Sequence, residues 1–483
     1  MVYPHRLAIS LLMSMSLFLH ASFVLGVDTY HGAYASSSSK EIDELPVTKD
    51  PDLDVQLVAD GLDFPTGMAF LDSEDILVVE KNTGEVKRIT NGEISEEPLL
   101  DVQVANEFER GLLGIAVTKE DIVNRPGGYA INDVTNVFLF FTESSDEEDG
   151  SDKCERENYC SEDGSPLGHR LYKYNLEKDA LTNRQLLLDI PPNQGADHLG
   201  GSIVIGPDDN IYLVTGDGDS CEYNSCEEEI YHSPVYSQTA NFVSGDLPQG
   251  RGGIIRITQD GNVVAKGDNE SILGNEHPLN MYYAYGIRNS FGMDFDPVTG
   301  SLWDTENGPG FGDEINLVKP GFNSGWAKTQ GMWPVSNYEL LDPTPQSGGY
   351  LYDAATISSE PEGLVDFNDN GKYSNPEFSW NVSVGVTAIK FLASDKLGKQ
   401  YENDVFVGDI KFGNLYSFEL TEGRTELSLP EETNDRIAND DEELEGVLFA
   451  EGFGGVTDIE VGPDGYLYVL SAGGSLYKIL ASS

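Results

Sequence analysis

Short runs of alternating apolar and polar residues recur along most of the chain, separated by turns rich in Gly, Pro, Asp and Asn. Alternation with a period of two is typical of β-strands that bury one face. The run at 201–205, for example, is followed by a turn at 206–210 and by a second run at 211–215. Almost no stretch has the 3.6-residue periodicity of a helix, so the sequence predicts an all-β fold.

Three or four such runs form a unit that recurs six times with imperfect self-similarity. The units begin at the runs 61–70, 111–117, 201–205, 282–295, 386–391 and 456–461, the fourth opening with the aromatic residues 282–285. This repetition predicts a six-bladed β-propeller with four-stranded antiparallel blades, in which loops at one end converge on the mouth of a central channel. A β-sandwich shows fewer and less self-similar repeats, so it is the second alternative.

The composition is strongly acidic. Among 483 residues there are 29 Lys and Arg and 83 Asp and Glu, which gives a formal net charge of −54. Nucleic acids and anionic membranes need a basic surface, so neither is an expected partner. With 39% hydrophobic residues the chain can bury a core, and we expect one propeller domain over 51–483.

The first 35 residues look like a targeting segment. A modest basic start precedes an apolar stretch at 7–25, and cleavage after residue 26 or 35 fits a signal peptide. An uncleaved N-terminal anchor is the alternative. The polar, Ser-rich segment 36–50 is expected to be a flexible leader. These features predict a secreted protein whose mature chain does not insert into a membrane.

Four cysteines agree with export. Cys154, Cys160, Cys221 and Cys226 lie in two acidic, glycine-bearing loops. Four cysteines allow three connectivities, of which two local bridges, 154–160 and 221–226, are the simplest. A zinc site is the competing interpretation, but no histidine follows at ligand spacing.

A histidine and an aspartate are the first candidates for chemistry. His198 follows Asp197 in a glycine-rich stretch, and neutral imidazole is the commonest general base. Asp217 ends the second run of the same unit, where it can orient a base or bind a cation. Taken alone, a hydrogen-bonded structural histidine and a turn-capping aspartate are the simpler explanations.

The richest stretch is 283–326, which brings a guanidinium, an amide and carboxylates to the ends of neighbouring strands. Arg288 is notable because basic residues are scarce, and a buried guanidinium needs an anion or a carbonyl. The bend at 307–309 offers carbonyl oxygens close to Asp313 and Glu314, and such hard ligands suit Ca²⁺. A salt bridge and a solvated acidic loop are the alternatives.

A second candidate for calcium lies at 366–377. Its polar residues match the calcium-loop pattern, although the flanking sequences do not look helical. The residues at ligand positions are Asp366, Asn368, Asn370, Ser374 and Glu377, with Gly371 at the turn.

Five motifs in order resemble those of the soluble quinoprotein sugar dehydrogenases, the glucose/sorbosone dehydrogenase family. They are GLDFPTGMAF (61–70), GLLGIA (111–116), DH (197–198) with GPD (206–208) and GD (216–217), YGIRNSFG (285–292), and ENGP (306–309) through DEINL (313–317) to NSGW (323–326). The likeness covers most of 61–479. It implies a six-bladed propeller that holds pyrroloquinoline quinone (PQQ) and Ca²⁺ at the channel mouth.

The resemblance also implies roles for matching positions. His198 falls at the general base with Asp217 beside it, and Arg288 and Asn289 fall where side chains contact the quinone. The other implied positions are Lys411 for the PQQ carboxylates, Glu109 and Asp197 for the sugar, the Gly308 and Pro309 carbonyls for the calcium at PQQ, and Asp313 and Glu314 for a second calcium. Phe412 departs from the family pattern and weakens the expectation for the PQQ carboxylates.

The implied reaction is oxidation of an aldose sugar at C1 to a lactone, with hydride passing to PQQ while the base takes the hydroxyl proton. Two other functions stay open at this point. One is a non-catalytic propeller that binds a sugar or a protein. The other is a calcium-dependent lactonase. The sugar and the electron acceptor cannot be chosen from the sequence.

Overall fold

The computed structural model describes residues 45–120, 134–145, 148–150, 166–192, 195–218, 235–264, 271–335 and 356–482. The chain divides into a unit at 1–41 and a unit at 42–483, and only the second contains described residues. The predicted signal peptide and all four cysteines therefore lie outside the described residues. Among the described residues, no helix is both long enough and apolar enough to cross a membrane.

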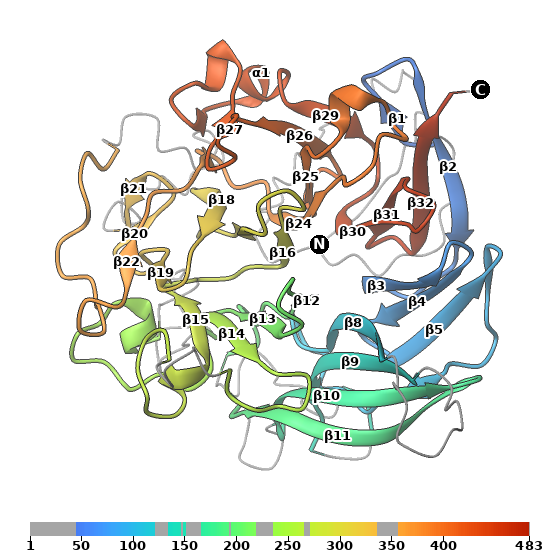
Figure 1. The fold of residues 1–483 in the computed structure, drawn as a ribbon, viewed down its shortest axis with the longest axis horizontal. Coiled ribbons are helices and arrows are strands. Elements are labelled where there is room, and N and C mark those ends of the chain that lie inside the picture. Colours follow the sequence, from blue (N-terminus) through green and yellow to red (C-terminus); the bar gives the residue numbers. More distant parts are fainter. Residues whose placement is uncertain are drawn as a thin grey trace, which may run out of the picture. The chain divides into compact units, whose positions relative to one another are not determined.

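Six sheets of four or more strands, here called blades, follow one another around an axis in the described part of the chain (Figure 1). Blade 1 consists of β3 (Pro65–Asp72), β4 (Asp75–Glu80) and β5 (Glu85–Thr90) with the short β6 (Glu93–Ile94) and β7 (Leu100–Asp101). Blade 2 consists of β8 (Leu112–Glu120), β9 (Val134–Glu143), β10 (Gly168–Glu177) and β11 (Ala180–Ile190). Blade 3 consists of β12 (Ile203–Ile205), β13 (Ile211–Thr215), β14 (Gly253–Ile257) and β15 (Tyr282–Tyr285), extended by β19 (Phe322–Asn323) and β22 (Lys372–Tyr373).

The second half of the chain repeats the arrangement. Blade 4 consists of β16 (Gly292–Phe295), β17 (Leu302–Glu306), β18 (Asp313–Val318), β23 (Phe378–Trp380) and β28 (Ile437–Ala438). Blade 5 consists of β24 (Val386–Phe391), β25 (Val405–Asp409), β26 (Leu415–Leu420) and β29 (Leu448–Glu451), with β1 (Val47–Thr48) and β27 (Leu427–Ser428) at its margin. Blade 6 consists of β30 (Val456–Val461), β31 (Leu467–Ser471), β32 (Ser475–Ala481) and β2 (Leu53–Asp60). The predicted six-bladed propeller is confirmed.

Several details differ from the sequence prediction. The aromatic run of β15 is not the start of the fourth unit, because it pairs with β14 as the outer strand of blade 3. β2 pairs with β32 and so completes blade 6 with a strand from the opposite end of the chain. The end of the expected leader, Val47–Thr48, pairs with β29. Several blades also have more than four strands, and β15–β19, β19–β22 and β23–β28 pair in parallel.

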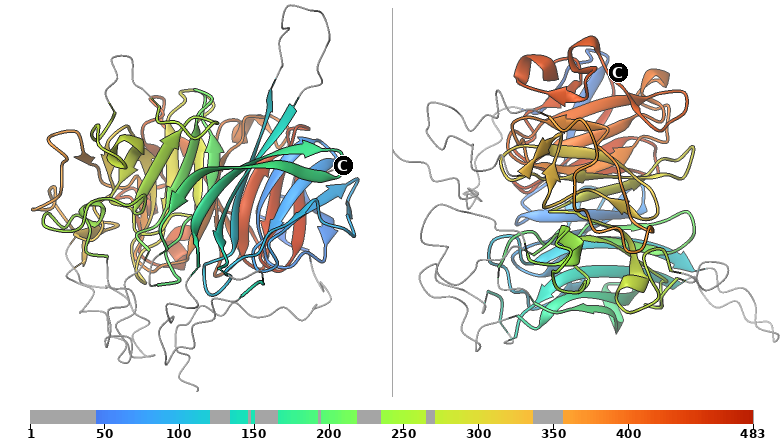
Figure 2. Two further views of the ribbon diagram at one scale, coloured as in Figure 1. Left: turned by 90° about the horizontal axis from the view of Figure 1, so that it is seen from below. Right: turned by 90° about the vertical axis from the view of Figure 1, so that its left-hand side faces the viewer.

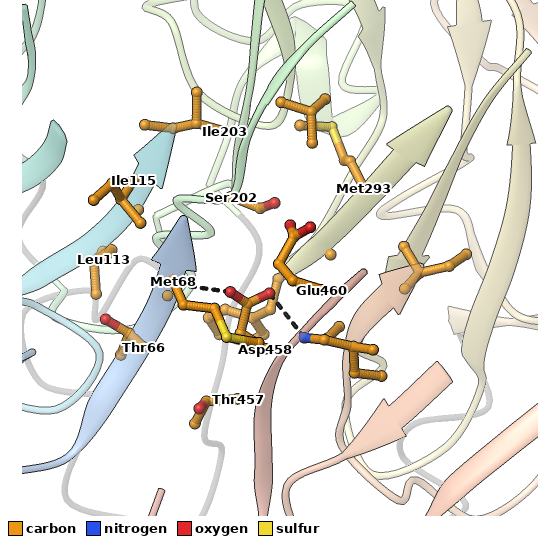
Figure 3. Close-up of a pocket in the computed structure, with 18 residues that line it drawn as sticks. Thr66, Met68, Leu113, Ile115, Ser202, Ile203, Met293, Thr457, Asp458 and Glu460 are labelled. Atoms are coloured by element: carbon orange, nitrogen blue, oxygen red, sulfur yellow. Dashed lines mark hydrogen bonds between the residues drawn. The ribbon is translucent and has the colours of Figure 1, made fainter. Parts of the chain in front are cut away.

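The innermost strand of every blade lines the axis. The strands of the blades stand side by side in Figure 2, with loops gathered at both ends. Residues of β3, β8, β12, β16, β24 and β30 surround a narrow cavity of about 40 Å³ on the axis (Figure 3). This cavity has room for only a few water molecules, so a cofactor or a sugar must bind at an end of the ring.

Candidate active site

Several predicted site residues lie on loops that lead into the innermost strands. Glu109 lies three residues before β8, and His198 lies five residues before β12. Arg288 and Asn289 precede β16 in the same way. Because the starts of the innermost strands face one end of the ring, these loops meet there, and we call this end the site face.

His198 and Asp217 form a buried hydrogen-bonded pair. Nδ1 of His198 lies 2.8 Å from Oδ1 of Asp217. The second carboxylate oxygen, Oδ2, accepts a hydrogen bond of 2.7 Å from Nε1 of Trp326. Burial raises the pKa of Asp217, but the bonds to His198 and Trp326 and the charge of Arg288 outweigh it and lower the pKa below its ordinary value. A carboxylate on Nδ1 fixes the imidazole orientation and makes Nε2 the nitrogen that exchanges protons.

The backbone around this pair is unusually tight. His198 has a left-handed φ of 58°, and its carbonyl accepts a hydrogen bond from the Gly218 amide. The Asp217 amide donates to the Arg288 carbonyl. A Cβ on Gly216 would lie 2.2 Å from the His198 carbonyl oxygen and 2.8 Å from that of Arg288. Only glycine fits there, and this close approach ties the His198 loop to the Arg288 loop.

Glu109 and Asn289 hold the His198 loop from two other blades. Oε2 of Glu109 accepts from the Leu199 amide at 3.1 Å, and Oδ1 of Asn289 accepts from the Gly200 amide at 3.2 Å. The Asn289 amide also donates to both Glu109 oxygens. Burial, followed by the charge of Asp197, raises the pKa of Glu109 to about 8 despite these bonds. Asp197 is half-buried beside them.

Arg288 reaches across the site with one donor still unused. Its side chain is only 4% exposed, and Nη1 donates to the Asn307 carbonyl at 2.9 Å. The guanidinium carbon lies 5.4 Å from the ring centroid of Trp326. Among the described residues nothing accepts from its buried Nε. A buried guanidinium nitrogen without an acceptor fits a ligand that brings a carbonyl or anionic oxygen.

The bend expected to bind calcium is folded around Asp313. Oδ1 of Asp313 accepts from the Gly308 amide at 2.9 Å and from the Ser383 hydroxyl at 2.7 Å. Oδ2 accepts from the amides of Val384 and Gly385. Gly308 and Pro309 are buried. In this structure Asp313 organises the bend that carries the Gly308 and Pro309 carbonyls, and its assignment as a metal ligand stays a prediction.

Glu314 lies in a set of three buried carboxylates on one face of blade 4, here called the blade 4 cluster. Its members are Asp304, Glu306 and Glu314, and register places Glu306 opposite Glu314. The Ser324 hydroxyl donates to Oε2 of both glutamates, at 2.6 Å and 3.1 Å. Burial raises the pKa of Glu306 to about 7 and the pKa of Asp304 and Glu314 well above their ordinary values. Such carboxylates need protons or a cation to stay buried.

The remaining candidates lie apart from these groups or have other partners. Lys411 is exposed next to Phe412, and its ammonium donates to the Ser383 carbonyl at 3.3 Å. In the loop 366–377, Asp366 is exposed, whereas Glu377 is 7% exposed and pairs with Arg436. Asn368 and Asn370 are also exposed. Among the described residues no three His, Cys, Asp or Glu side chains form a metal cage by themselves. Any metal here must therefore also use backbone or amide oxygens.

The chain is similar in sequence to a known protein family. The family model described as Glucose / Sorbosone dehydrogenase matches residues 62–478. The chain belongs to this family. The family match spans all six blades and every predicted site residue, which confirms the resemblance noted in the sequence.

Two relatives of this family member are known by name. It is 23% identical over 430 residues to the aldose sugar dehydrogenase YliI of Escherichia coli (strain K12), covering 88% of this chain and 92% of that protein. It is 25% identical over 406 residues to quinoprotein glucose dehydrogenase B of Acinetobacter calcoaceticus, covering 77% and 78%.

Solved structures share the fold of this family member. The soluble aldose sugar dehydrogenase of Escherichia coli in its apo form gives a TM-score of 0.60 at 21% identity, covering 89% of this chain and all of that one. The PQQ-bound aldose sugar dehydrogenase of Streptomyces coelicolor gives 0.55 at 20% identity, covering 91% of this chain and all of that one. At these identities the likeness supports the propeller fold alone.

Three features of the site were not predicted from the sequence. One is the indole of Trp326 on Asp217, another is the mutual binding of Glu109 and Asn289, and the third is the addition of Asp304 and Glu306 to Glu314. The third left a signal, because Asp304 and Glu306 alternate along a strand whose other residues are apolar or Thr. The other two join residues far apart in the chain and left no local pattern.

Proposed function

We propose that this protein is an exported oxidoreductase that oxidises aldose sugars at C1 to lactones, using PQQ and Ca²⁺. The observation that carries the proposal is the buried His198–Asp217 pair beside Arg288, whose Nε has no acceptor in the part of the chain that the structure describes. A base and an unsatisfied cationic donor in one buried site suit removal of a hydroxyl proton next to an electron-accepting oxygen. The names of the two relatives, an aldose sugar dehydrogenase and a quinoprotein glucose dehydrogenase, support the same chemistry.

The residues of the chain have distinct tasks in this proposal. Nε2 of His198 takes the proton of the C1 hydroxyl, and Asp217 stabilises the imidazolium that results. Asp217 is already biased toward its charged form, so it does not compete for that proton. Glu109 and Asp197 lie at the same face and are the proposed contacts to the sugar hydroxyls.

The described residues fit PQQ and Ca²⁺, the two groups that the proposed reaction requires. Arg288 Nε is the donor we assign to the quinone oxygen of PQQ, with Asn289 alongside and the exposed Lys411 near its carboxylates. The buried carbonyls of Gly308 and Pro309 are the proposed Ca²⁺ ligands, and Glu314 is the proposed ligand of a second Ca²⁺. When bound, PQQ accepts the hydride and Ca²⁺ polarises it. Asn289 has little hydrogen-bonding capacity left for PQQ, because its side-chain N–H already donates to Glu109 and its side-chain oxygen already accepts from the Gly200 amide.

Reconstitution tests the proposal. Metal-free protein is supplied with PQQ and Ca²⁺, and dye reduction is followed with a panel of aldoses. We expect sugar-dependent reduction that needs both additions and falls at least 1,000-fold in His198→Ala, as expected for loss of a general base. His169→Gln is the matched control, since His169 is also buried but its Nδ1 contacts Thr142 in blade 2.

The other outcomes separate the alternatives. Failure to bind PQQ overturns the dehydrogenase and leaves a binding propeller. PQQ binding without turnover of any aldose in the panel contradicts the substrate class. Export is tested separately, by sequencing the N-terminus of protein collected outside the producing cells, where a start at residue 27 or 36 is expected.

A further inference from the structure

Trp326 is a fixed part of the site face. Its side chain is 2% exposed, and its amide donates to the Gly286 carbonyl at 3.0 Å. Its carbonyl accepts from the side-chain amide of Asn241 at 2.7 Å, and Asn241 also exchanges two hydrogen bonds with Asn323. The backbone that carries the indole is therefore held on both sides, and the ring has little freedom to move.

The indole holds the oxygen of Asp217 that His198 does not use. Nε1 of Trp326 donates to Oδ2 at 2.7 Å, while His198 lies 2.8 Å from Oδ1. The terminal torsion of an aspartate is broad, so a single bond from His198 leaves the carboxylate free to rotate. A second donor from a rigid ring fixes its plane and thereby the direction of the imidazole.

The same ring also meets the cationic side of the site. The Arg288 guanidinium lies 5.4 Å from the ring centroid, within the range of a cation–π contact. One side chain thus contacts both the partner of the base and the arginine.

Burial alone does not explain the indole bond. Trp303 and Trp380 are also almost fully buried, and their Nε1 atoms have no acceptor among the described residues. The fold therefore tolerates buried indoles that make no hydrogen bond. Only at Trp326 does a buried indole point at a carboxylate that touches the catalytic histidine.

We propose that Trp326 is a positioning residue of the base, acting through Asp217 to hold His198 in register with Arg288. The part of this proposal that concerns turnover rests on the proposed function. The part that concerns geometry does not, because it rests only on the contacts that join Trp326, Asp217 and Arg288.

Trp326→Phe tests it, since the ring and its face stay while the N–H donor is lost. We expect kcat to fall about tenfold, the loss of one hydrogen bond to a charged group, with KM changed less than twofold. Asp217→Asn lowers kcat further, and the double variant is expected to be no worse than Asp217→Asn alone. Trp303→Phe is the matched control and keeps the wild-type kcat. Fully additive losses in the double variant would overturn the proposal.

A second measurement does not depend on catalytic activity. The chain has four tryptophans, which give four indole N–H signals in ¹⁵N-labelled, cofactor-free protein. We expect one signal to shift strongly in Asp217→Asn, and the Nδ1–H signal of His198 to move upfield in Trp326→Phe but not in Trp303→Phe. If Asp217→Asn leaves all four indole signals in place, the proposal fails even where the enzyme is active. If the indole signal shifts but no aldose is oxidised, the proposed function fails and the geometry stands.

Discussion

Two acidic clusters in this propeller, one buried and one half-buried, are stabilised in different ways. The blade 4 cluster, Asp304, Glu306 and Glu314, lies beside the candidate active site. The second, here called the channel cluster, consists of Asp294, Asp458 and Glu460 near the ends of innermost strands, and Figure 3 shows Asp458 and Glu460 on the axis. Each holds three carboxylates inside a protein that is already strongly acidic.

The channel cluster contains its own cation. Nζ of Lys390 lies 2.8 Å from Glu460 and 3.4 Å from Asp294. Although burial lowers the pKa of Lys390, the surrounding carboxylates raise it far more, so the ammonium stays charged. Asp458 is partly compensated by backbone amides of Met68 and Ile459.

The blade 4 cluster has no such partner among the described residues. Its glutamates accept hydrogen bonds from Ser324, Gln330, Asn316 and backbone amides, and the side-chain oxygens of Asp304 have no hydrogen bond within 3.5 Å among the described residues. The same residue types are therefore stabilised by different partners in the two clusters. The channel cluster holds an ammonium of the protein itself, although the pKa of Asp458 still rises to about 7, whereas the blade 4 cluster requires protons or an added cation such as Ca²⁺.

Removing the cation from the channel cluster should give the largest effect. Lys390→Met leaves two half-buried carboxylates without their counterion, and we expect the free energy of unfolding to fall by about 3 kcal/mol. Urea denaturation measures it, with the exposed Lys399→Met as control. A loss below about 1 kcal/mol would mean that the channel carboxylates are protonated and the two clusters are alike.

The pH dependence of stability should come next. The pKa of Glu306 rises from its ordinary 4.5 to about 7, so its stabilising contribution is complete below pH 4.5 and is lost as the pH rises to 7. In metal-free protein this is a loss of roughly 3 kcal/mol, and Glu306→Gln should remove that part of the slope. Asp458, with a pKa of about 7, adds a similar slope that Asp458→Asn removes. An unchanged slope in both variants would contradict the buried carboxyl groups as its source.

Calcium should distinguish the clusters by a slightly smaller amount. At a concentration 100 times its Kd, a ligand that binds only the folded state stabilises it by about 2.7 kcal/mol. Added calcium should therefore raise the melting temperature of the wild type. We expect this rise to disappear in Glu314→Gln and to persist in Glu460→Gln. Calcium should also reduce the pH dependence of stability that comes from Glu306 and leave unchanged the pH dependence that comes from Asp458. Loss of the response in Glu460→Gln instead would place the cation in the channel.

The smallest change is expected for Asp304→Asn. Burial raises the pKa of the Asp304 carboxyl well above its ordinary value and so favours its neutral form, and replacement by the similar amide should alter the free energy of unfolding of metal-free protein by less than about 1 kcal/mol. Calcium affinity should nevertheless drop, because one oxygen loses its charge. Calorimetric titration of wild type and variant checks both parts, and a calcium affinity equal to that of wild type would exclude Asp304 from the site.

The repeats show how far the sequence reached. The predicted first and second strands of all six units lie within or next to observed strands, because each strand carries its own alternation and its own turn. The closing strand of blade 6 was missed. β2 pairs with β32, more than 400 residues away, and no local pattern announces such a pairing.

For the site as well, the sequence indicated single residues but not their partners. Motif positions identified His198, Asp217, Arg288 and Asn289, and the structure places all four at one face. Their partners were a different matter. The assignment of Asp313 and Glu314 as one pair overlooked that neighbouring residues of a strand point to opposite faces, so that Asp313 bonds to 383–386 and Glu314 meets Glu306.

The sequence by itself determined the strands, their sixfold repetition, the acidic character and the candidate site residues, because each of these is encoded in residues close together along the chain. Only the tertiary structure decided which polar groups became partners. Trp326 and Asp217 are 109 residues apart, and Asn289 and Glu109 are 180 apart. Such contacts form only after the blades close into a ring, which brings loops from different blades to one face. Burial at that face then shifts the pKa values of the acidic side chains and so sets their protonation.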